Sequence, residues 1–529
     1  MLSAAAAPRA HHDHLAARRL AGSALSDAGV DEVGGVLATS DAATLADDLV
    51  LALSAMRAGA AERGGPLPAA EPSTVRRQVS TALSGDPLPT DGVGAGSALR
   101  DLCRLAGWGA ADAGDARCAG HLHTPPLSAA VAADTVAACL NQSLDSWDQA
   151  PAMTGLEDEV VHALGALVYG PAALTSGVVT TGGTESNLMG LLLARADVAR
   201  RVWGVDVMRT GLVAAPDHLR IYCSEVAHFS TQRMAGLLGL GEDCVRTIPV
   251  DERHRMRVDA LHEAMLAEQN TDPLAVVATA GTTDAGAVDP LPEIAAVARE
   301  HGCWLHVDAA YGGGALFSDR LAPLLEGMEL ADSVALDLHK LGWQPTAAGV
   351  FLARGAQALS PLARQVAYLN TVDDEEAGYT SLLGRSIRTT RRPDVLKIAV
   401  TLRALGRTGL GDLVDRCHEL AHYAAEQVDG YGALERALPV TLTSVVFRYT
   451  DTDTDTDTDT GHTGHTDAVN ARIRRELLGS GSAVVGRCEI DGQVWLKLTL
   501  LNPEAGPADV QALLDLVAQT GARIAGELA

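Results

Sequence analysis

Aromatic residues and cysteines are both scarce in this chain. Aromatic side chains make up 3% of its 529 residues, so alanine, valine and leucine must build most of any hydrophobic core. The eight cysteines stand singly, without a CxxC pair or a zinc-ligand spacing, and no metal ion is expected from them. So few cysteines in so long a chain argue against a disulfide framework and predict a reducing, cytoplasmic location.

Positive charge is also in short supply. Against 67 acidic residues the chain has 41 lysines and arginines, which gives a net charge of −26 at pH 7. Nucleic acids and anionic membranes bind positively charged surfaces, so neither is an expected partner. No uninterrupted apolar run approaches the roughly 18–20 residues that cross a bilayer. The first residues also lack the basic and apolar stretches of a signal peptide.

The chain does have enough apolar material for a large core, with 47% hydrophobic residues. Its composition and spacing predict four parts. These are an alanine-rich, disordered segment (1–40), a helical segment with Gly/Pro-rich breaks (41–125), a large domain (126–392) and a smaller C-terminal α+β domain (393–529) that contains a Thr-Asp repeat (450–466). The repeat has nothing to bury and is expected to form a disordered surface loop, although its aspartates and histidines also offer ligands for a cation.

Within the large domain, short apolar strands alternate with helices. Strands are expected at 176–181, 220–224, 245–250, 275–279, 304–308, 333–337 and 349–353, and helices at 185–202, 230–238, 258–269 and 291–301. This alternation predicts an α/β fold with a mainly parallel, seven-stranded sheet covered by helices on both faces. Active sites of such sheets lie at the carboxyl ends of the strands.

A lysine stands at the end of one of these strands, in the sequence DLHK at residues 337–340. Lys340 follows an imidazole at the mouth of an apolar run. Lysines that form Schiff bases occupy such partly desolvated positions, where the amine can lose its proton. Taken alone, the motif equally describes a lysine that snorkels at a strand end.

Glycines and a threonine follow another strand, in the sequence TTGGTESN at 180–187. Thr184 is a good N-cap for the helix expected next, and free N–H groups at a helix N-terminus bind phosphate. The loop is neither a Walker loop nor GxGxxG, so a nucleotide is not expected. The alternative is an ordinary capped surface helix.

Three further residues follow expected strands. Asp308 closes an apolar strand, where its carboxylate needs a cationic partner such as a protonated pyridine nitrogen or a structural arginine. His228 opens a helix, where it can stack on a planar ring or serve the structure. Thr283 lies in a turn whose hydroxyls can bind a ligand oxygen or cap a helix.

Taken together, these groups describe a site for pyridoxal 5′-phosphate (PLP). The cofactor needs an amine for its aldehyde, a carboxylate to keep its ring nitrogen protonated, a phosphate anchor and a group to stack on its ring. Each signal is moderate alone, and their joint occurrence after the strands of one sheet favours the cofactor.

At these residues the chain resembles the group II PLP-dependent amino-acid decarboxylases of the aspartate aminotransferase fold (fold type I). Among them it looks most like bacterial diaminobutyrate decarboxylases and siderophore-pathway lysine decarboxylases. The matching stretches are NQSLDSWDQ at 141–149, GGTESN at 182–187, HVDAAYG at 306–312, DLHK at 337–340, TTRR at 389–392 and LTLLNP at 498–503. They span roughly residues 120–520, and their order makes the resemblance specific for the superfamily.

The resemblance implies roles for individual residues. It matches Lys340 to the Schiff-base lysine, Asp308 to the aspartate on the pyridine nitrogen, His228 to the histidine over the ring, Gly183 and Thr184 to the phosphate loop, and Thr283 and His339 to further cofactor contacts. Lys340, His228 and Asp308 are thus the expected catalytic residues. The family also implies a homodimer with sites built at the subunit interface.

Two positions depart from part of the family. Relatives that act on aromatic amino acids often have asparagine where Asp337 stands, and an aspartate is a poor phosphate ligand, so it receives no role. Those relatives also carry a tyrosine on a mobile loop that protonates the product. That place falls near Leu382 here, and Tyr379 is close but out of register. Tyr379 is therefore either a site residue or an ordinary loop tyrosine.

The expected activity is α-decarboxylation of an L-amino acid to an amine and CO2. Asp148 and Gln149, in a polar loop, are suited to read a distal ammonium, which favours 2,4-diaminobutyrate, ornithine or lysine; the loop can equally be structural. Decarboxylation of a neutral or aromatic amino acid, an aminotransferase and a non-catalytic protein with the same fold are the alternatives. The pair Arg391-Arg392 is expected at the interface, at the substrate carboxylate or in solvent.

Overall fold

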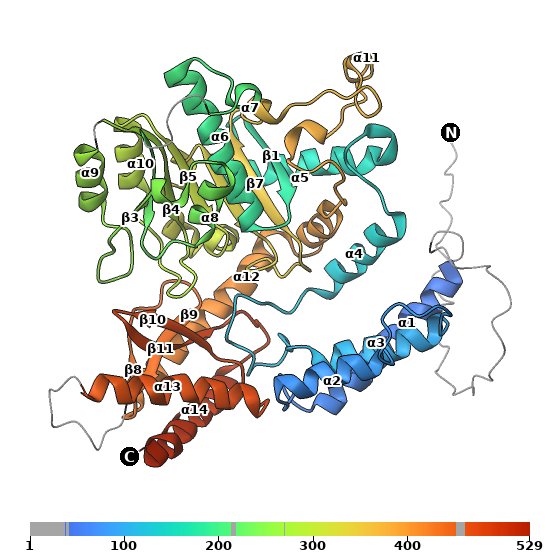
Figure 1. The fold of residues 1–529 in the computed structure, drawn as a ribbon, viewed down its shortest axis with the longest axis vertical. Helices are drawn as coiled ribbons and strands as arrows, with labels where there is room; N and C mark the ends of the chain where they lie inside the picture. The colour runs from blue at the N-terminus through green and yellow to red at the C-terminus, as the bar shows by residue number, and fades with distance from the viewer. Residues whose placement is uncertain (1–37, 39–41, 213–217, 269, 451–460, 529) are drawn as a thin grey trace, which may run out of the picture.

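The computed structural model describes residues 38, 42–212, 218–268, 270–450 and 461–528. Most of the N-terminal segment and most of the Thr-Asp repeat, for which the sequence predicts disorder, lie outside these residues. Figure 1 shows three bodies: a large domain, a smaller C-terminal domain beneath it, and a helical arm that leads away from both. No helix in the described ranges combines the length and the apolar character that a membrane span requires.

A seven-stranded sheet forms the centre of the large domain. Its strands are β1 (Thr175–Thr180), β2 (Leu219–Ser224), β3 (Val245–Ile248), β4 (Asp272–Thr279), β5 (Trp304–Ala309), β6 (Ser333–Asp337) and β7 (Gly349–Arg354). They are ordered β1-β7-β6-β5-β4-β2-β3. Strands β3, β2, β4, β5 and β6 run parallel, and β7 lies antiparallel to both β6 and β1. The prediction of a mainly parallel, seven-stranded sheet is confirmed.

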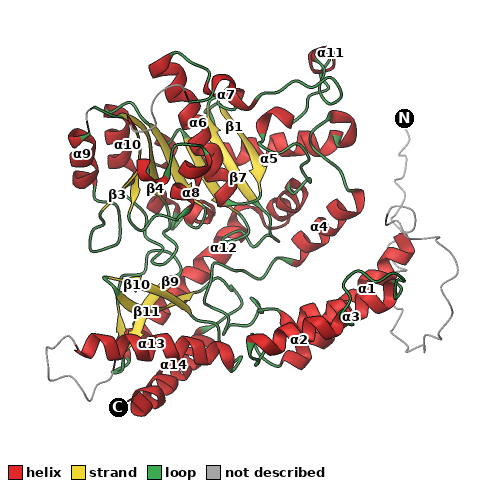
Figure 2. Cartoon of the chain, viewed as in Figure 1, coloured by secondary structure: helices red, strands yellow, loops and turns green. Residues whose placement is uncertain are grey.

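Helices cover both faces of this sheet, as Figure 2 shows. One face packs against α5 (Pro151–Tyr169), α9 (Val258–Ala267), α10 (Leu291–Glu300) and the first half of α12 (Val395–Gly430), and the other against α6 (Gly183–Trp203) and α8 (Ser230–Leu237). Successive strand residues alternate between the two cores. Val178 belongs to the α6 side and Val179 to the α5 side, because side chains of a strand point to opposite faces.

The C-terminal domain is built on a second, antiparallel sheet. It consists of β8 (Leu434–Arg436), β9 (Ser444–Tyr449), β10 (Gly486–Ile490) and β11 (Gln493–Thr499), in the order β10-β11-β9-β8, with α13 (Gly461–Gly479) and α14 (Pro507–Leu528). Its core also includes the second half of α12, beyond a non-helical residue at Gly406. Helix α12 therefore contributes to both cores, and the division of the chain at residue 393 stays a prediction.

The arm consists of α1 (Ala42–Arg63), α2 (Pro72–Ala82) and α3 (Ala95–Gly109). Figure 1 shows it extending away from both domains. Arg63, at the end of α1, pairs with Asp112 at 2.6 Å. The chain then runs beside the C-terminal domain, where the Ala119 N–H donates to Val484 O, and continues through α4 (Ser128–Leu140), which packs on α12.

Short elements complete the fold. They are α7 (Val207–Thr210), α11 (Val372–Glu376) and the 3-10 helices η1 (Trp147–Gln149), η3 (Glu242–Cys244), η4 (Gly312–Phe317), η5 (Ala322–Leu325), η6 (Met328–Leu330), η7 (Ser360–Leu362) and η8 (Leu383–Arg385). One difference from expectation concerns the Thr-Asp repeat. A loop was expected up to residue 466, whereas α13 begins at Gly461, so the repeat is followed directly by a helix.

Candidate active site

One cavity of about 370 Å³ lies at the carboxyl edge of the large sheet. It is lined by every residue that the sequence predicts for the cofactor: Gly183, Thr184, His228, Thr283, Asp308, His339 and Lys340. Its size is within the range of about 300–1,000 Å³ that is usual for small-molecule sites. Tyr311 lines the cavity and links it to the C-terminal domain, because its hydroxyl lies 2.7 Å from the hydroxyl of Thr443.

The topology explains this convergence. Residues after the ends of β1, β2, β4, β5 and β6 meet at one edge because these five strands point the same way. Residues more than 150 positions apart in the sequence, such as Gly183 and Lys340, are thereby brought to one cavity.

Lys340 is the lysine that lines the cavity. The chain's other lysines are Lys397 and Lys497. Lys397 is buried between two aspartates of α4 and α12, and Lys497 pairs with Asp284 at 2.8 Å. Lys340 Nζ lies 3.1 Å from Asp337 Oδ2, with only 19% of its side chain exposed. Among the lysines of this chain, Lys340 alone is placed to react with a molecule in this cavity.

Asp337, which the sequence left without a role, is a wall of the same cavity. Its side chain is 3% exposed, and its Oδ1 has no hydrogen-bond partner among the described residues. Burial raises the pKa of this carboxyl above its usual value, and the positive charges of Lys340 and His339 oppose the rise. The sequence does indicate this position, because Asp337 precedes Lys340 by only three residues. No role is predicted for it, because relatives that act on aromatic amino acids often have asparagine there.

The amino end of α6 forms another wall. Gly182, not Thr184, is the N-cap residue, and Thr184 lies in the first turn of the helix. Gly182 has φ +155°, and a Cβ on it would lie 3.2 Å from His339 Cε1. A Cβ on Gly183 would lie 2.8 Å from Ala310 Cβ. The two glycines therefore keep open a space in front of unpaired backbone N–H groups, which is a favourable position for an anion.

A chain of hydrogen bonds leads from the core to Asp308. Trp304 Nε1–H donates to Ser333 Oγ at 2.9 Å, and Ser333 Oγ is 2.8 Å from His306 Nδ1. His306 Nε2 is 2.9 Å from Asn187 Oδ1, and Asn187 Nδ2 donates to Asp308 Oδ2 at 2.7 Å. Burial lowers the pKa of His306 to about 4, so its imidazole is neutral at physiological pH.

The order of donors in this chain is fixed at Asn187. Its Oδ1 only accepts, so His306 Nε2 carries the ring proton and donates to it, and the amide N–H groups of Asn187 remain for Asp308. Because the imidazole is neutral, its Nδ1 accepts the hydrogen of the Ser333 hydroxyl. The carboxylate of Asp308 also accepts the Ala310 N–H at 3.1 Å. Two donors thus hold Asp308 in one orientation.

The same asparagine reaches His228. Asn187 Nδ2 donates to Ser230 Oγ at 3.0 Å, and Ser230 Oγ lies 2.8 Å from His228 Nδ1. The Ser230 N–H also donates to this nitrogen, at 3.3 Å. His228 Nδ1 is therefore the acceptor and Nε2 carries the proton. Burial lowers the pKa of His228, which favours this neutral form.

Asn187 ends the TTGGTESN motif, but the sequence predicts no role for it. It lies four residues after Gly183 on α6, and residues at this spacing share a helix face. It is only 2% exposed, and a buried amide needs partners. The spacing alone could have placed Asn187 toward the cavity, but neither the spacing nor the burial reveals its partners.

The residues expected for substrate recognition lie apart from this cavity. Asp148 and Tyr379 line a separate groove of about 360 Å³, where the rings of Trp147 and Tyr379 meet edge to face. Gln149 donates to Asp145 at 2.9 Å within its own loop. Leu382, the position at which the family comparison expects a tyrosine, is buried. Within one chain, the structure does not bring these residues to Lys340.

The structure places Arg391 and Arg392 in ion pairs within the chain; Arg391 is buried, which contradicts the expectation of a pair in solvent, and a role at the subunit interface stays a prediction. Arg391 is 2% exposed and pairs inside the chain with Glu157 at 2.8 Å. Arg392 pairs with Asp134 at 2.6 Å and with Asp394 at 2.7 Å. These pairs anchor the start of α12, and neither arginine lines the cavity that contains Lys340.

PLP fits the residues that are present. The glycine-lined end of α6 suits its phosphate, Asp308 suits a protonated ring nitrogen, and Lys340 suits its aldehyde. The unpartnered oxygen of Asp337 and the space that a Cβ on Gly183 would fill both indicate a site that is shaped for a ligand. The donor set therefore matches the cofactor that was expected from the sequence.

Comparison with known proteins gives the same result. The family model of the pyridoxal-dependent decarboxylase conserved domain matches residues 114–450. An L-2,4-diaminobutyrate decarboxylase of Rhizobium meliloti (strain 1021) is 42% identical over 82% of this chain and 84% of the relative. A protein of the same name from Acinetobacter baumannii is 36% identical over 77% of this chain and 80% of the relative.

The solved structures agree. The structure of the glutamate decarboxylase domain of diaminobutyrate-pyruvate transaminase and L-2,4-diaminobutyrate decarboxylase from Vibrio parahaemolyticus has a TM-score of 0.80 and 32% identity. The similarity covers 91% of this chain and 96% of that chain. With the matched domain covering more than half of the sequence and the cavity carrying the groups that its cofactor needs, the chain belongs to the pyridoxal-dependent decarboxylases.

Proposed function

We propose that this protein is a PLP-dependent decarboxylase of L-2,4-diaminobutyrate, which it converts to 1,3-diaminopropane and CO2. The observation that carries the chemistry is Lys340, the cavity's lysine, in one cavity with Asp308 and the end of α6. The similarity to two L-2,4-diaminobutyrate decarboxylases supports this substrate over lysine and ornithine.

Each residue of the cavity has its own role in the proposed reaction. When bound, PLP supplies an aldehyde that takes the substrate amine and a protonated ring that withdraws electrons from the α-carbon. Lys340 Nζ would hold the cofactor through its aldehyde. Asp308, fixed by Asn187 and the Ala310 N–H, keeps the proton on the ring nitrogen. Gly183 and Thr184 bind the phosphate, and Thr283 and His339 complete the cavity wall.

Proton supply follows from the hydrogen-bond order. The bond between the α-carbon and the carboxylate breaks, CO2 leaves, and the α-carbon must then take up a proton. His228 has its Nδ1 occupied by Ser230, so its Nε2–H is the group that it offers to a bound molecule. Lys340 Nζ is the second proton carrier in the cavity. We assign the proton return to these two groups.

A substrate panel tests the proposal. The PLP-loaded protein is incubated with L-2,4-diaminobutyrate, ornithine, lysine, glutamate and an aromatic amino acid, and CO2 and amine are measured for each. The highest kcat/KM is expected for diaminobutyrate. Preference for any other amino acid would overturn the substrate. Stoichiometric formation of a keto acid without CO2 would make the protein an aminotransferase and overturn the activity as well.

The groove lined by Asp148 and Tyr379, with Gln149 next to it in the sequence, takes part in this proposal through a second copy of the chain. We expect a homodimer in which this groove faces the cavity of the other copy and reads the distal ammonium. Asp148→Lys should then raise KM for diaminobutyrate far more than for a neutral amino acid, because only the former carries a positive distal group. Equal changes for both substrates would defeat this role.

The uncovered face of α1 supports a homodimer. Leu49, Val50, Leu53 and Met56 recur at helical spacing and are 37–58% exposed. A stripe of this kind is normally covered. For location we propose the cytoplasm, since all eight cysteines are free thiols, five of them buried.

A further inference from the structure

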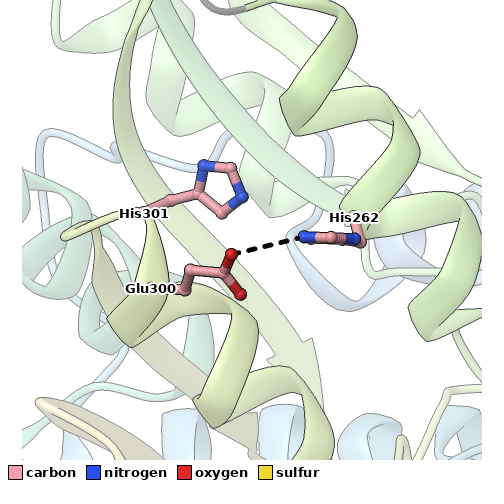
Figure 3. Close-up of side chains that lie close together, drawn as sticks. All are labelled: His262, Glu300 and His301. Carbon is pink, nitrogen blue, oxygen red and sulfur yellow. Dashed lines mark ion pairs between the residues drawn. The ribbon is translucent and has the colours of Figure 1, made fainter.

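Two histidines and a glutamate converge on the surface of the large domain, away from the cofactor cavity. His262 comes from α9, Glu300 is the last residue of α10, and His301 follows it. One ligand atom from each lies within 4.8 Å of the other two. Figure 3 shows the three side chains pointing into one space, with a dashed line between His262 and Glu300.

The Nε2 atoms of both imidazoles in this cluster lack hydrogen-bond partners in the described part of the chain. Nε2 of His262 and Nε2 of His301 are shielded from solvent and make no hydrogen bond with any described residue. His262 Nε2 is 3.6 Å from Glu300 Oε1, which is too long for a hydrogen bond. A shielded polar atom without a hydrogen-bond partner destabilises the fold, and here two such atoms lie in one cluster. The two unpaired nitrogens and their closeness to the Glu300 carboxylate indicate a ligand that lies among the three side chains.

The backbone holds the three residues in place. On a regular helix, neighbours such as Glu300 and His301 point in different directions. Here α10 ends between them, so both can turn to the same space. Helix α9 is anchored by Leu261 and Met265, which are buried on either side of His262. The positions of the three residues therefore depend on core packing, whereas the side chains of His262 and Glu300 are 39% and 65% exposed and can adjust.

We propose that His262, Glu300 and His301 bind a zinc-like divalent transition-metal ion that clips the end of α10 to α9. Two imidazoles and a carboxylate suit Zn²⁺, whereas Mg²⁺ and Ca²⁺ prefer oxygen ligands. Bonds of about 2.0–2.1 Å to a tetrahedral ion place ligand atoms roughly 3.3 Å apart, so the three side chains need to move together by about 1 Å. Water takes the fourth position.

The experiment uses the full-length, PLP-loaded protein without an affinity tag. Each protein is dialysed against ZnCl2 and its bound zinc is counted. Wild type is expected to bind one more zinc ion per chain than His262→Gln or His301→Gln, and Glu300→Gln should bind this ion at least tenfold more weakly. The control is His162→Gln, which replaces an exposed histidine of α5 and should bind zinc as wild type does.

A second measurement locates the ion. Crystals grown with ZnCl2 should give an anomalous peak between the three side chains, and excess Mg²⁺ should leave it unchanged. Because these residues lie outside the cofactor cavity, the variants should decarboxylate at the wild-type rate, which also verifies their folding. Equal zinc content in wild type, His262→Gln and His301→Gln, or a zinc peak elsewhere only, would overturn the site and leave the proposed activity untouched.

Discussion

Asn187 is the residue on which the hydrogen bonds of the cavity converge. Its single amide accepts from His306 and donates to both Asp308 and Ser230, so it sets the orientation of a carboxylate and the tautomer of His228 together. Such supporting residues usually matter nearly as much as the groups that touch a ligand. We therefore regard Asn187 as a positioning residue for two others.

Replacing Asn187 by alanine tests this role. By analogy with other supporting residues, kcat should fall about 10- to 100-fold. KM should change little, because Asn187 is not expected to bind the substrate directly. The pH profile should also shift, since His228 loses its fixed tautomer. The control is Asn470→Ala, which removes a buried asparagine of the C-terminal domain and should leave kcat unchanged. Equal losses in the two variants would indicate a structural role only.

We predict that Asp337 makes cofactor binding depend on pH. It adjoins the end of α6, Lys340, His339 and, farther away, Asp308. Burial raises its pKa, so lowering the pH protonates it and removes a negative charge beside the phosphate. The affinity for PLP should therefore fall as the pH rises.

Asp337→Asn should remove this dependence and bind PLP several-fold more tightly at mildly alkaline pH. Titration of each protein with PLP, followed by absorbance at a series of pH values, measures both effects. Parallel pH profiles for wild type and variant would contradict the assignment.

At the scale of elements, we expect the amino end of α6 to hold the phosphate of the cofactor. A Cβ on Gly183 would approach Ala310 Cβ to 2.8 Å, so alanine there must displace the start of the helix. Overpacking of this kind costs about 1–3 kcal/mol, and the Kd for PLP in Gly183→Ala should rise about tenfold or more. Gly155→Ala on α5 is the control, since a Cβ there meets nothing within 4 Å. An unchanged Kd in Gly183→Ala would place the phosphate elsewhere.

These elements also explain what the sequence could predict. Lys340, Asp308 and Thr283 each follow an apolar strand, and parallel strands bring such residues to one edge, so pattern alone places them together. The contacts of Asn187 and Arg391 could not be predicted, because their partners His306 and Glu157 lie more than 100 residues away and depend on how helices pack. The start of α13 was missed because Gly and Thr are poor helix formers.

At the scale of the whole molecule, the arm α1–α3 is the part that one chain leaves uncovered. It extends from the body in Figure 1, and the side chains of its stripe on α1 are 37–58% exposed. A second copy that covers this stripe would bury apolar side chains, and each fully buried leucine stabilises the assembly by about 1.5–3 kcal/mol.

Leu53→Glu places a charge in this stripe and should shift the protein from dimer to monomer in light scattering. Leu174→Glu, which changes an exposed leucine before β1, is the matched control and should remain dimeric. A monomeric wild type, or a Leu53→Glu variant that stays fully dimeric, would contradict the role of the arm.

The central claim is that Lys340 holds PLP in the cavity at the edge of the sheet. Borohydride reduction of the PLP-loaded protein fixes the cofactor to the lysine that holds it, and peptide mass spectrometry then identifies that residue. The chain offers three candidates, Lys340, Lys397 and Lys497. The modification is expected on the peptide that contains Lys340 and on neither of the others. Modification of Lys397 or Lys497 instead, or of no lysine, would contradict the claim.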